Sequence, residues 1–419
     1  MNRPLSRSWN AIGWAFATLV FVGGTQLIGG VTSGDASDSI NTTWAIAHGQ
    51  LACAYPPGNQ YGLAYTGPLY PYVSGALTAI LRIGHQVPFP TAADFGAHCA
   101  KAAASMYYWS LHSGAQGSTL LVGYVCWLAI LFGMVAVLRT SGRGRTGWEP
   151  FGLVLLAIVP PVFMCLHEYF HPQDLLAMGL ILGGVACVRR ESWIWCGILL
   201  GLAFTSQPFA LLALAPLIVI APPQKLVRFL TATLCSIVVV VAPLAAFAPK
   251  AALRAALTGT GTTWTSVTMM DESHISGPLL IFGSRYLPIA AAMALAWWAQ
   301  HRLGTKITDP VPLISLIASS LSFRLIFEVN LWGYYFMAVA VSVLVLDVVR
   351  GRLRWSYFAW LILIVVAFHP VIRSISAWGF SGTRWFSLLT WQLILAPLGS
   401  LLAVKPLLDS VKRDRLQIT

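Results

Sequence analysis

Residues 119–138, TLLVGYVCWLAILFGMVAVL, decide the fold, because this stretch holds no charged side chain. A helix needs about 20 consecutive apolar residues to cross the hydrocarbon core of a bilayer. The whole chain of 419 residues has the same character: 57% of the residues are hydrophobic, 10% are charged, and the mean hydropathy is +0.72. A soluble domain of this length could not bury so much apolar surface in one core. Lipid must therefore be the solvent for most of the chain.

Similar apolar runs recur along the sequence and predict one all-α domain over 1–419, a polytopic transmembrane helical bundle. The runs predict about twelve membrane helices. Several runs are shorter than a full crossing, so we expect some of them to be half-helices or tilted pieces. The run 68–83 would reverse every later loop if it crossed, and it is predicted to lie along the interface. The runs are 11–30, 119–138, 151–166, 175–188, 193–205, 209–221, 229–247, 279–298, 311–327, 336–349, 357–372 and 388–404.

The positions of the basic residues predict the orientation of the bundle. When the runs alternate across the membrane, most of the 26 Lys and Arg residues fall on one side, which the positive-inside rule assigns to the cytoplasm. Both termini then lie inside, and the long loop 31–118 lies outside together with most carboxylates. The net charge of +12 is spread over short loops, which argues against nucleic-acid binding. The inward residues are Arg3, Arg7, Arg139, Arg143, Arg145, Arg189, Arg190, Lys225, Arg228, Arg302, Lys306, Arg350, Arg352, Arg354, Lys405, Lys412, Arg413 and Arg415.

The outer loop 31–118 begins with polar side chains directly after the first run. Residues 31–50 read VTSGDASDSINTTWAIAHGQ, so Asp35 and Asp38 stand at the outer membrane boundary, shortly before Trp44. A carboxylate at this place can act as a general base toward a hydroxyl group. The alternative is that Asp38 caps a helix beginning near Ser39. Asp38 is the preferred base and Asp35 its rival.

A second outer turn, 167–174, reads HEYFHPQD and combines imidazoles with carboxylates. Its first five residues match the His-Glu-x-x-His zinc pattern, which requires both imidazoles on one face of a helix. Pro172 disfavours helical geometry at His171, so the pattern is a weak indication of zinc. A solvated turn is the alternative to a substrate contact. The chemically able residues of this turn are His167, Glu168, His171 and Asp174.

One arginine is predicted near the outer end of a membrane helix. Residues 322–335 read SFRLIFEVNLWGYY, which places Arg324 inside the apolar run. Charges within a membrane are functional by default, and a guanidinium binds phosphate oxygens through paired hydrogen bonds. The alternative is an ion pair between Arg324 and Glu328 one helical turn later. The two interpretations are compatible, and Tyr334 and Tyr335 follow closely.

These motifs resemble those of the GT-C class of integral membrane glycosyltransferases. The carboxylate after the first helix, the run PLYPY at 68–72 and the stretch from Arg324 to Tyr335 are each similar to a segment of that class. The resemblance covers most of the chain through scattered short motifs. Residues 201–207 are similar to a further segment, but Gln207 stands where the class often has lysine. Another cation must then neutralise a phosphate, and Arg324 is the candidate.

The resemblance implies transfer of a sugar, mannose or arabinose, from a polyprenyl-phosphate sugar to an envelope glycolipid or glycan, with inversion. It implies a multi-pass protein of a bacterial plasma membrane with its site on the outer face. Asp38 or Asp35 would activate the acceptor hydroxyl. No cofactor is implied with certainty, a divalent cation at the turn 167–174 stays open, and no metal ligand is assigned. The substrate-binding residues would be His167, Glu168, His171, Asp174, Arg324, Tyr334, Tyr335 and Trp44.

A secondary transporter or lipid flippase is the alternative from another functional class. Transporters place charges near the midplane on broken helices in paired repeats, whereas this sequence shows no internal repeat and its polar clusters lie at helix ends. The outer loop also holds Cys53 and Cys99, which can form a disulfide in an oxidising compartment. The other five cysteines fall in apolar runs and are expected to pack as small hydrophobic residues.

Overall fold

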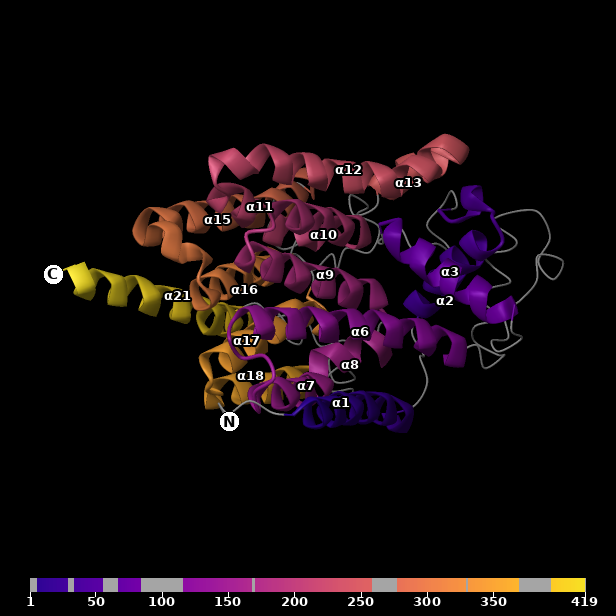
Figure 1. Cartoon of the computed structure of the whole chain (residues 1–419). Helices are drawn as coiled ribbons and strands as arrows, with labels where there is room; N and C mark the ends of the chain where they lie inside the picture. Colours follow the sequence, from indigo (N-terminus) through magenta and orange to yellow (C-terminus); the bar gives the residue numbers. More distant parts are fainter. Residues whose placement is uncertain are drawn as a thin grey trace, which may run out of the picture.

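The computed structural model describes residues 6–28, 34–55, 67–83, 116–167, 170–257, 277–328, 331–368 and 393–418. Every regular element in these ranges is a helix, and the long helices run side by side as a bundle (Figure 1). Six helices are long and apolar enough to cross a membrane. The chain is therefore an all-helical, multi-pass membrane protein, as the apolar runs predicted.

The helices of the bundle follow the predicted runs closely. They are α1 (Arg7–Ile28), α6 (Gln116–Thr140), α7 (Trp148–Ala157), α8 (Pro160–His167), α9 (Pro172–Arg189), α10 (Trp193–Ser206), α11 (Leu211–Ile220), α12 (Pro223–Phe247), α15 (Gly277–Leu303), α16 (Pro310–Phe327), α17 (Met337–Arg350), α18 (Trp355–Ala367) and α21 (Ala396–Ile418). Four short 3-10 turns join or extend them, η1 (Leu51–Cys53), η2 (Pro208–Ala210), η3 (Gly304–Thr308) and η4 (Gly333–Phe336).

Twelve full crossings are not found in the described part of the chain. The run 151–166 is two helices, α7 and α8, bent by 44° at a short break before Pro160. Counted as one span, this pair raises the six spans to seven. Helices α10, α11 and α18 are apolar but shorter than a crossing, as the lengths of 193–205 and 209–221 predicted. Buried within a bundle, such short helices need not span the bilayer.

Small residues let the central helices approach closely. A Cβ added to Gly179 of α9 would lie 2.3 Å from the carbonyl carbon of Ala129 in α6, and one added to Gly201 of α10 would lie 2.0 Å from the Ser236 hydroxyl in α12. Helix association in lipid depends on such close packing, because apolar side chains gain nothing by leaving the lipid. Helices α6, α9, α10 and α12 are thereby fixed as neighbours (Figure 1).

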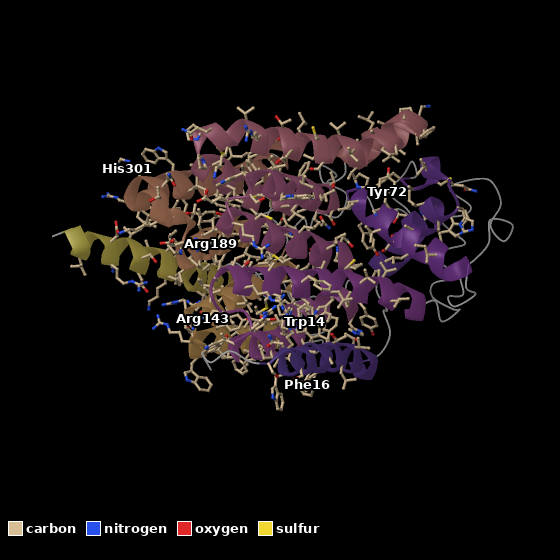
Figure 2. The ribbon with its side chains drawn as sticks, in the orientation of Figure 1. Trp14, Phe16, Tyr72, Arg143, Arg189 and His301 are labelled. Carbon is tan, nitrogen blue, oxygen red and sulfur yellow. The ribbon has the colours of Figure 1, made fainter. Side chains whose placement is uncertain are left out.

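The basic turns gather at one end of the bundle. Arg143 donates to the carbonyl of Val349 at the end of α17 (2.9 Å), and Arg189 donates to the carbonyl of Thr308 in η3 (2.6 Å). Lys306 pairs with Asp414 of α21 at 2.5 Å. Figure 2 shows Arg143, Arg189 and His301 at the end opposite Tyr72. The grouping agrees with the predicted sidedness of these turns, while the assignment of this basic end to the cytoplasm stays a prediction.

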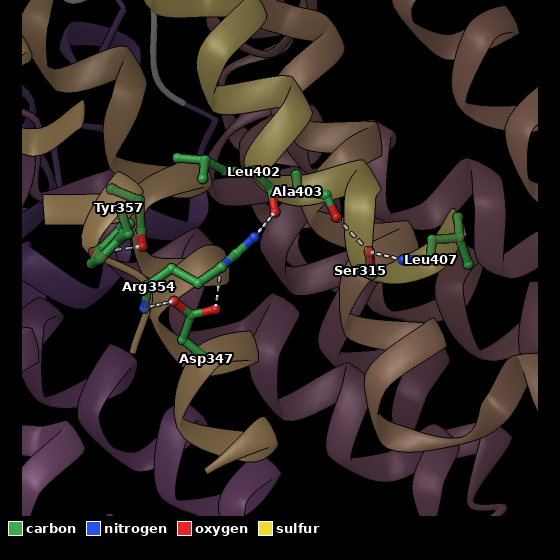
Figure 3. A network of polar contacts seen from close by, with 8 residues as sticks. Ser315, Asp347, Arg354, Tyr357, Leu402, Ala403 and Leu407 are labelled. Carbon is green, nitrogen blue, oxygen red and sulfur yellow. Dashed lines mark hydrogen bonds and ion pairs between the residues drawn. The ribbon is translucent and has the colours of Figure 1, made fainter. Parts of the chain in front are cut away.

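Two side chains from other helices form hydrogen bonds with the backbone around the proline of the last helix (Figure 3). Pro406 lies inside α21 and cannot donate to the carbonyl of Leu402, which instead accepts from Arg354 at 2.7 Å. Ser315 of α16 accepts from the Leu407 N–H at 3.1 Å and donates to the carbonyl of Ala403. The backbone groups that lose their helical partners around Pro406 are thus hydrogen-bonded within the protein, as a lipid environment requires.

Two helices of the long loop 31–118 lie beyond the other end of the bundle, α2 (Gly34–Ala47) and α3 (Leu69–Ile83) (Figure 1). Hydrogen bonds of 2.7 Å join the hydroxyls of Ser39 and Tyr70, and those of Thr43 and Ser74. Each pair is 31 residues apart in sequence. The two helices therefore run parallel, so their first turns lie at the same end. Helix α3 occupies the run 68–83, which was predicted to lie along the interface rather than to cross.

Candidate functional site

Four helix ends meet at the end of the bundle opposite the basic turns. They are the start of α9 at His171 to Asp174, the end of α10 at Ser206 and Gln207, the end of α16 at Arg324 to Glu328, and the turn η4 with Tyr334 and Tyr335. Each of these helices has its other end at or next to a basic turn. The four ends form the candidate site.

The turn between α8 and α9 has an unusual backbone. Helix α8 ends at His167, and Phe170 is fully buried with a φ of 51°, a left-handed conformation that is rare for a residue with a large side chain. The His171 N–H then donates to the carbonyl of Cys165 at 2.5 Å. His171 precedes the first turn of α9, so it shares no helix face with His167. The helical zinc geometry of the His-Glu-x-x-His pattern is therefore not formed, and Glu168 lies outside the described residues.

The imidazole of His171 is held from two sides. Its ring stacks on Tyr334, with centroids 4.0 Å apart and planes 13° from parallel. Its Nδ1 lies 2.9 Å from Nε2 of Gln173, a fully buried residue whose backbone carbonyl accepts from the Ser206 hydroxyl at 3.0 Å. Stacking and hydrogen bonding together fix the orientation of the ring.

Arg324 lies between aromatic rings and carboxylates. Its guanidinium carbon is 3.9 Å from the centroid of the Tyr335 ring and 5.3 Å from that of Phe209. Its Nε lies 3.5 Å from Glu328 Oε2, so the predicted ion pair one helical turn apart is present. A cation over aromatic faces keeps its hydrogen-bonding edge available for further partners.

Asp174 completes the polar cluster. It is buried in the first turn of α9, and His171, Arg324 and Gln207 are its neighbours in the cluster. Its Oδ1 atom has no hydrogen-bond partner within the protein. A buried carboxylate oxygen without a donor is costly, and such atoms mark places where a ligand or water supplies the missing hydrogen bond. The structure therefore brings together five of the predicted residues, namely His171, Asp174, Arg324, Tyr334 and Tyr335.

The outer-loop helices are attached next to this cluster. The Gly67 N–H donates to the carbonyl of Ser206 at 3.1 Å, and a Cβ on Gly67 would lie 2.0 Å from the carbonyl oxygen of Thr205. Helix α3 thus begins at the end of α10. Because α2 runs parallel to α3, the first turns of α2, which contain Asp35 and Asp38, lie at the same end as the start of α3. The side chains of these two aspartates lie outside the described residues.

Trp44 has a packing role in the structure. It is fully buried in a second core with Cys53, Tyr55 and residues of α12 such as Leu244, and its ring lies 4.9 Å from that of His48. This core attaches the outer loop to α12 and to the short helix α13 (Pro249–Leu257). Substrate contact by Trp44 stays a prediction without support from this placement. Cys53 is disulfide-bonded, while Cys99 lies outside the described residues.

Several residues of the site were not predicted from the sequence. Gln173 and Ser206 hold His171 and α9, Phe209 flanks Arg324, and Gly67 attaches α3. The Gln207-Pro208 break between two apolar runs was the available signal for Phe209, because a proline at this place ends one helix and starts another. Among the described residues, no group of three or more His, Cys, Asp or Glu side chains is arranged to hold a metal ion.

The sequence matches no protein-family model and no curated protein. Among solved structures, the chain is similar to the crystal structure of ArnT from Cupriavidus metallidurans bound to undecaprenyl phosphate, with a TM-score of 0.48 and 14% sequence identity. The similarity covers 97% of this chain and 76% of that chain. Similarity at this level assigns neither fold family nor activity. The function is therefore argued from the residues themselves.

Proposed function

We propose that this protein is a glycosyltransferase that moves a sugar from a polyprenyl-phosphate sugar to a hydroxyl of an envelope glycolipid or glycan. The observation that carries the proposal is the cluster around Arg324, where a cation sits between aromatic faces at the end of a membrane helix. A lipid-linked phosphate would meet such a cation at the membrane boundary, where the lipid chain stays in the bilayer and the phosphate leaves it.

The roles follow from the chemistry of each group. Arg324 would bind the phosphate oxygens and stabilise the charge of the leaving group. Asp174 and the oriented imidazole of His171 offer hydrogen-bonding groups to the sugar or phosphate, and Tyr334 and Tyr335 provide aromatic walls. Asp38, or Asp35 in its place, would accept the proton of the acceptor hydroxyl.

The finer assignments also belong to the proposal. Direct displacement of the lipid phosphate by one activated hydroxyl needs no covalent enzyme intermediate, so transfer would invert the anomeric configuration. Mannose or arabinose is the proposed sugar, from the resemblance of the motifs. The site is proposed to lie at the outer face of a bacterial plasma membrane, because the positive-inside rule assigns the basic end to the cytoplasm.

The test is a transfer assay with purified protein, radiolabelled polyprenyl-phosphate mannose or arabinose, and a membrane glycolipid fraction as acceptor. Helix α2 begins at Gly34, so Asp38 lies inside the helix and does not cap one beginning at Ser39. Asp38→Asn keeps the size of the side chain but removes the base, so transfer should fall about 100-fold or more. Asp35→Asn should be milder. If Asp35→Asn abolishes transfer while Asp38→Asn leaves it intact, the base is Asp35. Full activity in both variants, or no transfer by the unaltered protein from either donor, would contradict the proposed mechanism.

A further inference from the structure

The basic end of the bundle contains two arginine-rich turns that the structure joins. One is 139–145 between α6 and α7, and the other is 350–354 between α17 and α18. Arg143 from the first turn donates to the Val349 carbonyl at 2.9 Å, and its guanidinium lies against Gly351, where a Cβ would come within 2.7 Å. Gly351 has a φ of 70°, which suits glycine. The close approach of the two turns therefore depends on a glycine at this position.

The carboxylates near these turns are already used to shape them. Glu149 is fully buried and accepts from the Arg139 guanidinium at 3.0 Å and from the Arg145 N–H at 2.6 Å. Asp347 is fully buried and accepts from Arg354 at 2.7 Å. None of the ion pairs among the described residues involves the exposed side chains of Arg145 or Arg352. Positive charge thus remains on the surface of the joined turns.

Arg145 also carries backbone strain. Its φ is 55°, a conformation that costs free energy for a residue with a side chain, and the bond from its N–H to Glu149 holds it there. The strain is maintained while the side chain points to the surface. Glu149 thus fixes the backbone from which the exposed Arg145 side chain extends.

Exposed tryptophans place this patch at the membrane surface. Trp355 follows the second turn directly and is 88% exposed. Trp9 is 62% exposed and lies one turn before Trp14, the residue of α1 that contacts Glu149. Tryptophan is enriched at the level of lipid headgroups. This enrichment predicts that the two arginines lie at the depth of the lipid phosphates.

We propose that Arg145 and Arg352, whose turns are joined by the contact of Arg143 with the end of α17, bind the phosphate of an anionic phospholipid headgroup. Guanidinium groups at a membrane boundary suit this ligand, because they give paired hydrogen bonds to phosphate and their charge attracts anionic lipids. The site lies at the other end of the bundle from Arg324 and is independent of the proposed transfer reaction.

The experiment measures the Tm of the purified full-length protein in neutral detergent with added phosphatidylglycerol or phosphatidylcholine. Phosphatidylglycerol should raise the Tm of the unaltered protein by about 5 °C, and phosphatidylcholine should not. The double variant Arg145→Gln/Arg352→Gln should lose this rise. The matched control Arg228→Gln/Arg302→Gln removes two exposed arginines from the same end of the bundle and should keep it.

Three outcomes would overturn the proposal. The first is that both double variants respond to phosphatidylglycerol alike, which would indicate general charge attraction. The second is that phosphatidylcholine stabilises the protein equally. The third is that glycerol phosphate or inorganic phosphate alone reproduces the rise, which would indicate a soluble anion. Should the double variant fail to fold, Arg352→Gln alone should reduce the rise at least in part, and an unchanged rise would count against the site.

Discussion

The two ends of the bundle use similar residues in different ways. At the basic end, Glu149 and Asp347 are buried and both oxygens of each carboxylate accept hydrogen bonds from neighbouring donors. At the opposite end, the buried Asp174 keeps one oxygen without a donor, and Arg324 is held by aromatic faces and one carboxylate partner. Fully satisfied carboxylates fix turns, whereas a partly satisfied cluster can accept a ligand. The comparison teaches that the two ends differ in whether the oxygens of their buried carboxylates are all hydrogen-bonded.

The largest expected contrast between the ends is their accessibility. In a cysteine-free background, a membrane-impermeant maleimide should label Ala76→Cys on α3 in intact cells and Arg352→Cys only in inverted vesicles. Both positions are exposed on the surface of the protein. Labelling of the two positions from the same side would show that the predicted orientation of the bundle is wrong.

Asp347→Ala should reveal the scaffold role of the basic end. It leaves Arg354 partly buried without its carboxylate, and breaking a buried pair in this way typically costs about 3 to 5 kcal/mol of unfolding free energy. Denaturant titration in detergent measures the loss, and transfer by the remaining folded protein should be unchanged. Asp409→Ala is the control, because Asp409 takes part in no ion pair among the described residues. Equal stability of the two variants would contradict the scaffold role.

Arg324→Lys should give a smaller effect, seen in substrate binding rather than in stability. Lysine keeps the charge but loses the paired hydrogen bonds and the flat contact with Tyr335, so donor binding should weaken by about 1 to 3 kcal/mol. The measurement is the apparent donor affinity in the transfer assay. Arg285→Lys, an exposed arginine of α15, is the matched control. An unchanged donor affinity together with a reduced stability would show that Arg324 has a structural role, through its ion pair with Glu328.

Much of the fold could be predicted from apolar runs alone, because membrane helices are set by local composition. The run 119–138 became α6 at Gln116–Thr140, and 311–327 became α16 at Pro310–Phe327. The bend between α7 and α8 was not predicted, although Pro160 and Pro161 indicated it. The helical conformation is disfavoured for a residue that precedes a proline. Twelve full crossings are not found among the described residues, and apolar character alone does not distinguish a spanning helix from a short buried one.

The candidate site could be predicted only in parts. Arg324 was predicted because a charge within an apolar run requires a reason, and Asp174 because it belongs to a turn that combines imidazoles with carboxylates. That the two residues belong to one cluster could not be predicted, because they are 150 positions apart and their proximity depends on how α9 and α16 pack. Trp44 was predicted to contact substrate because it lies near Asp38 in the sequence. In the structure its side chain is buried in the second core, which sequence spacing alone did not show.

Helix α21, with Pro406 inside it, bears on the order in which the protein is assembled in the membrane. The two side chains that satisfy its freed carbonyls, Ser315 and Arg354, belong to segments synthesised before α21. Ser315 and Arg354 are therefore synthesised before the helix with which they form hydrogen bonds. The final step of assembly is then the packing of α21 against the helices that carry Ser315 and Arg354. A chain that ended before Leu402 would leave Ser315 and one Nη group of Arg354 without these hydrogen bonds, while Arg354 would keep its ion pair with Asp347.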